Sequence, residues 1–190
     1  MTHDLPDAHG GRRPAAGPNR LADPPQVILG VDPGLNRTGY AVLGRGTPAP
    51  RLLEAGVIRS NAKRTLAERL QEIGQGLAEV CEQYRPEVLA LEQVFSTGQF
   101  PQSALLMAHA RGVILFVASR HATEVVHYAP RQMKRLLTGS GNAGKEQVQR
   151  AVQSELKLPA VLEPNDVSDA VAIALCHYHS VRLPANLLGG

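Results

Sequence analysis

The sequence lacks the features of a membrane or secreted protein. No apolar run in its 190 residues reaches the roughly 18 needed to span a bilayer, and the N-terminus has no apolar segment typical of a secretory signal. Cysteine is scarce, because only Cys81 and Cys176 are present, without the CxxC or Cys/His spacing of a metal site. We therefore expect two buried free thiols and a cytoplasmic protein.

Neither sign of charge dominates. The 20 Lys and Arg residues and the 17 Asp and Glu residues leave a formal net charge of +3, which permits a polyanionic partner without requiring one. With 43% hydrophobic residues, the chain can form one folded domain, which we place at residues 26–182. Residues 1–25 are rich in Pro, Gly, Ala and Asp and predict a disordered tail, followed at the other end by a short tail at 183–190.

Apolar alternation and turn signals predict an α/β fold. Three short apolar runs separated by Gly/Pro turns predict an antiparallel meander at 27–32, 38–45 and 51–60. The elements expected after the meander are a helix at 66–84, a strand at 87–95, a helix at 102–120, a strand at 123–128, and helices at 130–137, 144–157 and 165–181. This order predicts a mixed five-stranded sheet, with three antiparallel strands plus two parallel ones and helices on both faces.

Two carboxylates stand where predicted strands end. Asp32 closes the run VILGVD, and Glu92 interrupts VLALEQVF. Each has an ordinary explanation, since Asp32 begins an Asp-Pro-Gly turn and Glu92 can face outward at a strand end. However, the first and fourth strands can be parallel neighbours, so that both acids meet at adjacent strand ends. An unpaired carboxylate between two helical layers is unfavourable, and a cation is a natural partner.

Two more carboxylates begin the last predicted helix. Asp166 and Asp169 are three residues apart in PNDVSDAVAIAL and therefore share one helix face. They also fall in the first turn, where the helix dipole favours acids in any protein. Docked beside the two strand ends, this helix would complete a cluster of four carboxylates, a donor set that hard cations such as Mg²⁺ select. Two such ions can activate water for attack on a phosphodiester.

The segment 131–150 is the most basic part of the chain. A solvated helical face is its ordinary explanation. Lys145, however, follows a Gly-rich loop and opens a helix, so its ammonium and backbone N–H groups can meet a phosphate together. The segment carries five basic residues against the single acid Glu146, namely Arg131, Lys134, Arg135, Lys145 and Arg150.

Five motifs in this order resemble the RuvC family of Holliday-junction resolvases, within the ribonuclease H-like superfamily. They are ILGVDPGLNRTGY, LALEQVF, SALLMAHARGV, YAPRQMKRLLTGSGNAGKEQV and NDVSDAVAIALCHYH. The resemblance implies a crossover junction endodeoxyribonuclease of DNA recombination and repair. It implies a homodimer that binds a four-way DNA junction and nicks two opposed strands with Mg²⁺ or Mn²⁺, two ions per subunit. It also implies cooperation with the RuvA and RuvB branch-migration proteins.

The resemblance also assigns roles to single residues. It implies that Phe95 stacks on an unpaired base at the crossover, although a core aromatic is the ordinary explanation. It places Lys134 and Lys145 near the DNA backbone and the scissile phosphate, within a DNA-contacting segment that includes Arg131 and Arg135. The expected catalytic residues and metal ligands are Asp32, Glu92, Asp166 and Asp169, with Lys145 as a further catalytic residue.

Assembly and rival functions complete the expectations. The helix predicted at 102–120 is apolar nearly all round, which suggests a two-fold dimer contact or, alternatively, burial within one subunit. GVDPGLNRTG loosely resembles the phosphate-binding hairpin of actin-like and sugar-kinase-like ATPases, but that fold needs two such domains. Two further candidate functions are a non-catalytic binder of branched nucleic acid and a nuclease of the same fold acting on RNA.

Overall fold

The computed structural model describes residues 27–46, 49–93 and 101–182. The predicted order of elements is confirmed. The tails predicted at 1–25 and 183–190, and Phe95, lie outside the described residues. The elements are β1 (Val27–Asp32), β2 (Arg37–Gly44), β3 (Arg51–Arg59), α1 (Leu66–Tyr84), β4 (Val88–Glu92), α2 (Pro101–Arg120), β5 (Glu124–Tyr128), α3 (Pro130–Thr138), α4 (Lys145–Glu155) and α5 (Asn165–Ser180).

The described strands form one mixed sheet in the order β3-β2-β1-β4-β5. The meander β1, β2 and β3 pairs antiparallel, whereas β4 joins β1 and β5 joins β4 in parallel, as the sequence predicts. The register pairs Val31 of β1 with Leu91 of β4. The residues that follow, Asp32 and Glu92, therefore end adjacent strands at the same edge of the sheet.

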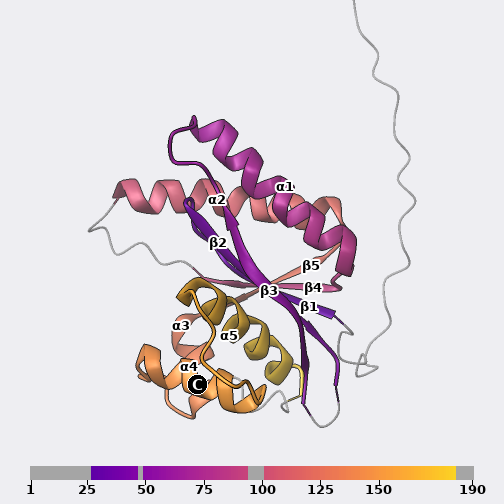
Figure 1. Cartoon of the computed structure of the whole chain (residues 1–190), viewed down its shortest axis with the longest axis vertical. Coiled ribbons are helices and arrows are strands. Elements are labelled where there is room, and N and C mark those ends of the chain that lie inside the picture. The colour runs from indigo at the N-terminus through magenta and orange to yellow at the C-terminus, as the bar shows by residue number, and fades with distance from the viewer. Residues whose placement is uncertain (1–26, 47–48, 94–100, 183–190) are drawn as a thin grey trace, which may run out of the picture.

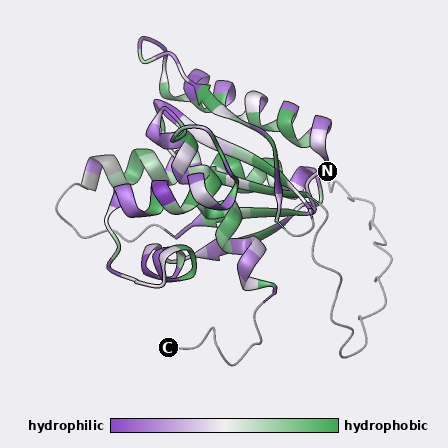
Figure 2. Cartoon of the chain, turned by 60° about the horizontal axis from the view of Figure 1, so that its bottom comes forward, coloured by the Kyte–Doolittle hydropathy of each residue, from purple (hydrophilic) through white to green (hydrophobic). Residues whose placement is uncertain are grey.

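The sheet lies between two helical layers, with α1 and α2 on one face and α3, α4 and α5 on the other (Figure 1). Side-chain alternation divides the core between them, since Leu29 and Val31 pack toward α1 and α2 while Ile28 packs toward α5. Figure 2 shows hydrophobic residues gathered on the strands and on the helix segments beside them. Because both faces are covered, charged groups on the central strands can reach water only near the strand ends.

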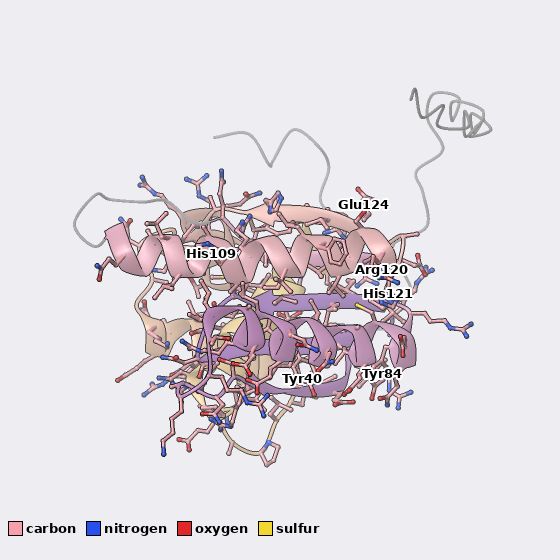
Figure 3. All side chains as sticks on the ribbon, turned by 90° about the horizontal axis from the view of Figure 1, so that it is seen from above. Tyr40, Tyr84, His109, Arg120, His121 and Glu124 are labelled. Carbon is pink, nitrogen blue, oxygen red and sulfur yellow. The ribbon has the colours of Figure 1, made fainter. Side chains whose placement is uncertain are left out.

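Polar contacts fix α1 at both of its ends. A capping box begins the helix, because Glu68 N donates to Thr65 Oγ1 and Thr65 N donates to Glu68 Oε2 at 2.9 Å. Toward the other end, Glu54 of the edge strand β3 accepts hydrogen bonds from the hydroxyls of Tyr40 on β2 and Tyr84 on α1. The two tyrosines are labelled in Figure 3. The meander and α1 are therefore held together as one unit.

The helix α2 packs beside α1 and leaves part of its apolar surface uncovered. Ala110 and Ile114 are fully buried against the sheet and α1, whereas Leu105 and Phe116 are each 61% exposed. The expectation of a surplus apolar face on this helix is therefore met. In the described part of the chain, no helix has the length and apolar character needed to cross a membrane.

Candidate active site

Two acidic side chains end adjacent strands on the same face of the sheet. Asp32 ends β1 and Glu92 ends β4, and both are half-buried. Ile28 and Ala90, which precede them at even spacing, belong to the core under α5. Alternation therefore places both carboxylates on the α5 side of the sheet.

The helix α5 lies closer to this face than ordinary side chains would allow. A Cβ atom on Gly30 would lie 2.2 Å from the carbonyl oxygen of Ala170, and one on Gly39 would lie 2.0 Å from that of Asp166. The two glycines thus let the first turns of α5 rest directly on β1 and β2, which brings Asp166 and Asp169 to the strand ends. Sequence reasoning did not identify this role, although glycines inside apolar strands are a signal of close backbone approach.

The four carboxylates act on one another electrostatically. Burial, the largest cause, and nearby negative charge together raise the pKa of Asp32 to about 7. The negative charges are, in decreasing order of effect, those of Asp169, Glu92 and Asp166. Burial and Asp169 likewise raise the pKa of Glu92. The structure therefore brings together the four acids that the sequence singles out.

Each acid of α5 has a basic partner from another element. Nζ of Lys145 donates a hydrogen bond to Oδ2 of Asp169 at 2.9 Å. Nε of Arg37, at the start of β2, lies 3.2 Å from Oδ2 of Asp166. Over the described ranges of the chain, no ion pair involves either of the strand acids. The two helix acids thus have direct basic partners, whereas basic groups act on the two strand acids only from a greater distance.

The basic segment approaches the cluster from α3 and α4. Lys145 is the first residue of α4, directly after the Gly-rich loop, as the sequence predicts. Burial and Asp169 raise the pKa of Glu92, and Lys134 of α3 is the strongest of the basic groups that act against them. Arg131 and Arg135 instead lie on the exposed surface of α3. Two of the predicted DNA-binding residues, Lys134 and Lys145, therefore lie near the acids, and two lie on the adjoining surface.

A guanidinium group from α2 supports the end of β4. Arg111 donates one hydrogen bond to the carbonyl oxygen of Glu92 and lies 2.7 Å from Nδ1 of His127 on β5. It therefore ties α2 to the two parallel strands beside the site. Sequence reasoning did not single out Arg111, because the contact joins residues 19 apart and no local pattern announces it.

The acids suit a hard divalent cation by their chemistry. All four offer carboxylate oxygens, which Mg²⁺ and similar ions select. Oδ2 of Asp166 is buried and unsatisfied, since its contact with Arg37 lacks hydrogen-bond geometry. Within the described ranges, however, no three acidic, histidine or cysteine side chains form a ready-made metal site. A cation bound here would have to draw the carboxylates closer together, and it would offset the negative charges that act on Asp32.

Comparison with known proteins gives one consistent family. The family model for crossover junction endodeoxyribonuclease RuvC matches residues 28–177. The protein of that name from Rhodopirellula baltica is 50% identical over 157 residues, which are 83% of this chain and 88% of that protein. The one from Pseudoalteromonas atlantica is 43% identical over 154 residues, covering 81% of this chain and 87% of that protein.

Solved structures agree with the sequence comparisons. The structure of Thermus thermophilus RuvC in complex with Holliday junction substrate is matched with a TM-score of 0.78 at 34% identity, over 83% of this chain and 95% of that one. The yeast mitochondrial Holliday junction resolvase Ydc2, at 13% identity and a TM-score of 0.60, shares the fold.

The mixed sheet, its two helical layers and the acids at its edge define a ribonuclease H-like nuclease. Within that class, the chain belongs to the RuvC family of crossover junction endodeoxyribonucleases, which are metal-dependent enzymes. This membership favours the junction nuclease over the ATPase, the non-catalytic binder and the RNA-directed enzyme.

Proposed function

We propose that this protein resolves four-way DNA junctions by paired, symmetric nicks, with two divalent cations, Mg²⁺ or Mn²⁺, held in each subunit by Asp32, Glu92, Asp166 and Asp169. One observation carries the assignment of the site. The pKa of Asp32 rises to about 7 through burial and through the charges of the other three acids. Four carboxylates from two strands and one helix thus lie near enough to act on one another, and no ion pair in the described residues neutralises the strand pair.

The chemistry follows from these positions. When bound, the cations supply the charge that activates water and stabilises the leaving oxygen of an in-line displacement. The strand ends hold Asp32 and Glu92 near each other, because each directly follows the last residue pair of the parallel β1–β4 ladder, Val31 and Leu91. Lys145 is placed to donate to a phosphate oxygen at the helix N-terminus, where backbone N–H groups also favour an anion.

We place the DNA path over α3 and the start of α4. Lys134 and Lys145 stand beside the acids, and Arg131 and Arg135 extend the basic surface away from them. Such side chains bind phosphates without reading bases, which suits recognition of junction shape. Phe95 follows β4 by three residues and is our candidate for stacking on an unpaired base.

We infer a homodimer that uses the uncovered face of α2. Leu105 and Phe116 are exposed on this helix, and Gly112 between them has no neighbouring atom within 4 Å of the position a Cβ would take. Small residues between large apolar ones let two copies of a helix approach closely. A two-fold contact would set two active sites symmetrically on a four-way junction. Cooperation with RuvA and RuvB would follow from the family.

We place the nuclease in residues 26–182, with 1–25 and 183–190 dispensable for cleavage. Both cysteines are buried and free, which fits a reducing cytoplasm. Deletion of residues 1–24 should leave junction cleavage and thermal stability nearly unchanged. A fall of many degrees in the melting temperature would show that the tail belongs to the fold.

The decisive experiment compares substrates and cations. The protein is incubated with a synthetic four-way junction, a linear duplex and an RNA–DNA hybrid, each with and without Mg²⁺. We expect symmetric nicks in the junction alone and only with the cation. Asp32→Asn should lower cleavage by several orders of magnitude while junction binding persists. Glu124→Gln, which changes an exposed acid at the opposite end of the parallel strands, is the matched control. Full cleavage by Asp32→Asn in Mg²⁺ would overturn the assignment.

A further inference from the structure

Arg37 is a charged residue at the acidic cluster to which neither its motif nor the family resemblance gives a role. It begins β2, and its guanidinium lies against α5, with Nε 3.2 Å from Oδ2 of Asp166. The side chain is 49% exposed, whereas that of Asp166 is 21% exposed. A cation thus sits at the solvent edge of the site and contacts one of its proposed metal ligands.

The contact is weak and easily exchanged. It joins one nitrogen to one oxygen without hydrogen-bond geometry, and that oxygen is otherwise unsatisfied in the described structure. A guanidinium has five N–H donors arranged to bind two oxygens at once. In the described ranges, no hydrogen bond from the terminal nitrogens of Arg37 is present. Half-exposed ion pairs of this kind contribute little stability, so the partner can change at small cost.

The backbone that carries Arg37 is held rigidly, unlike its side chain. Thr38 Oγ1 donates to the carbonyl of Gly34 at 2.8 Å, and Ser60 N donates to the carbonyl of Asn36 at 3.1 Å. Arg69 of α1 donates further hydrogen bonds to the carbonyl oxygen of Leu35 and to the side chain of Asn36 in the same turn. The guanidinium therefore moves only through its own side-chain torsions, about a fixed point beside the acids.

Bound cations and bound substrate should both favour release of Arg37 from Asp166. A divalent cation on Asp166 weakens the attraction between that carboxylate and Arg37, because the positive charges repel each other. A phosphodiester placed at the acids brings anionic oxygens to the same edge, and a guanidinium binds such oxygens in bidentate fashion.

We propose that Arg37 is a substrate-binding residue that neutralises Asp166 while the site is empty and transfers to a phosphate of the bound DNA strand when the site is loaded. The inference rests on the proposed function and extends it. It assigns a DNA contact to β2, across the acids from the basic segment of α3 and α4. Arg37 and Lys145 then flank the acids from two sides. Each of them contacts one aspartate of α5 while the site is empty.

The test uses the full chain with Arg37→Gln, which removes the charge, and Arg37→Lys, which keeps it. Arg59→Gln is the matched control, because Arg59 pairs with Arg37 across the β2–β3 ladder and is exposed, and no ion pair of it is present in the described residues. Binding of Mn²⁺ without DNA is measured by calorimetry. Junction binding in Ca²⁺ is measured against salt concentration, and single-turnover cleavage gives rate and apparent affinity separately.

Arg37→Gln should bind Mn²⁺ about threefold to tenfold more tightly, because a competing charge has left Asp166. It should bind junctions more weakly, with a log–log salt slope about one unit smaller in magnitude. Arg37→Lys should restore the salt slope, and Arg59→Gln should match the wild type in Mn²⁺ affinity.

Weaker Mn²⁺ binding by Arg37→Gln, or a salt slope of that variant equal to that of Arg59→Gln, would overturn the inference about Arg37. If the wild type still cleaves junctions, the proposed function would stand in that case. A wild type that neither binds Mn²⁺ nor cleaves junctions would overturn both. If Arg37→Gln melts well below the wild type, all variants are compared at a temperature at which each is folded, and the same two outcomes decide.

Discussion

Asp32→Asn should stabilise the cation-free protein while it abolishes cleavage. The carboxyl of Asp32 has its pKa raised from 3.8 to about 7 by burial and by Asp169, Glu92 and Asp166. The folded state therefore disfavours the ionised form. The two pKa values differ by about three, which corresponds to a limit of about 4 kcal/mol in the free energy of unfolding. Because the site is partly open to water, we expect a gain of about 2 kcal/mol or more.

The gain should depend on pH in a defined way. Below pH 3.8 the carboxyl is protonated in both states, so it contributes no difference. Between 3.8 and about 7 the folded protein holds a proton that the unfolded chain has released, so wild-type stability falls as pH rises. The penalty is complete above about 7. Asparagine cannot ionise, so the variant should match the wild type near pH 4 and exceed it at pH 8.

Urea unfolding in EDTA at pH 4 and pH 8 measures the effect directly. Asp166→Asn is the matched control, because its carboxylate already has Arg37 as a partner and should yield a much smaller gain. Added Mg²⁺ should stabilise the wild type more than Asp32→Asn, since a ligand stabilises the state that binds it. If Asp32→Asn is no more stable than the wild type in EDTA at pH 8, the inferred repulsion among the acids is wrong.

Three further changes test other parts of the molecule. Gly39→Ala should lower the free energy of unfolding by about 1–3 kcal/mol or more and displace the start of α5, because its Cβ would lie 2.0 Å from the backbone of Asp166. Gly44→Ala on the same strand is the control, because its Cβ would meet only a leucine side chain at 3.0 Å. Urea unfolding should show a smaller loss of stability for Gly44→Ala than for Gly39→Ala. Phe116→Glu should turn a dimer into a monomer by light scattering, and an unchanged mass would place the interface elsewhere. Phe95→Ala should slow single-turnover cleavage of a matched junction and be partly rescued by mismatches at the crossover, whereas equal rates on the matched junction would exclude stacking.

Local patterns account for the elements and for part of the site. The strands are short and rich in apolar residues, and the capping box at Thr65 sets the start of α1, so the order of elements follows from neighbours in sequence. The meeting of Asp32 and Glu92 also follows, because a meander followed by parallel crossovers leaves β1 beside β4. The contacts of Arg37 and Arg111 could not be predicted, since each depends on how far apart two distant elements settle after packing.

The glycines show why a cluster of acids can exist at this edge at all. Without side chains at Gly30 and Gly39, α5 presses against the sheet and holds Asp166 and Asp169 near two carboxylates that they repel. Arg37 and Lys145 offset that repulsion on the helix side, while the strand side keeps it. In the proposed function, the unfavourable charge that remains would be the source of affinity for a divalent cation, because the ion would remove the repulsion when it binds. Stability of the empty site and function of the loaded site therefore oppose each other, so a substitution that relieves the cluster should lose cleavage as it gains stability.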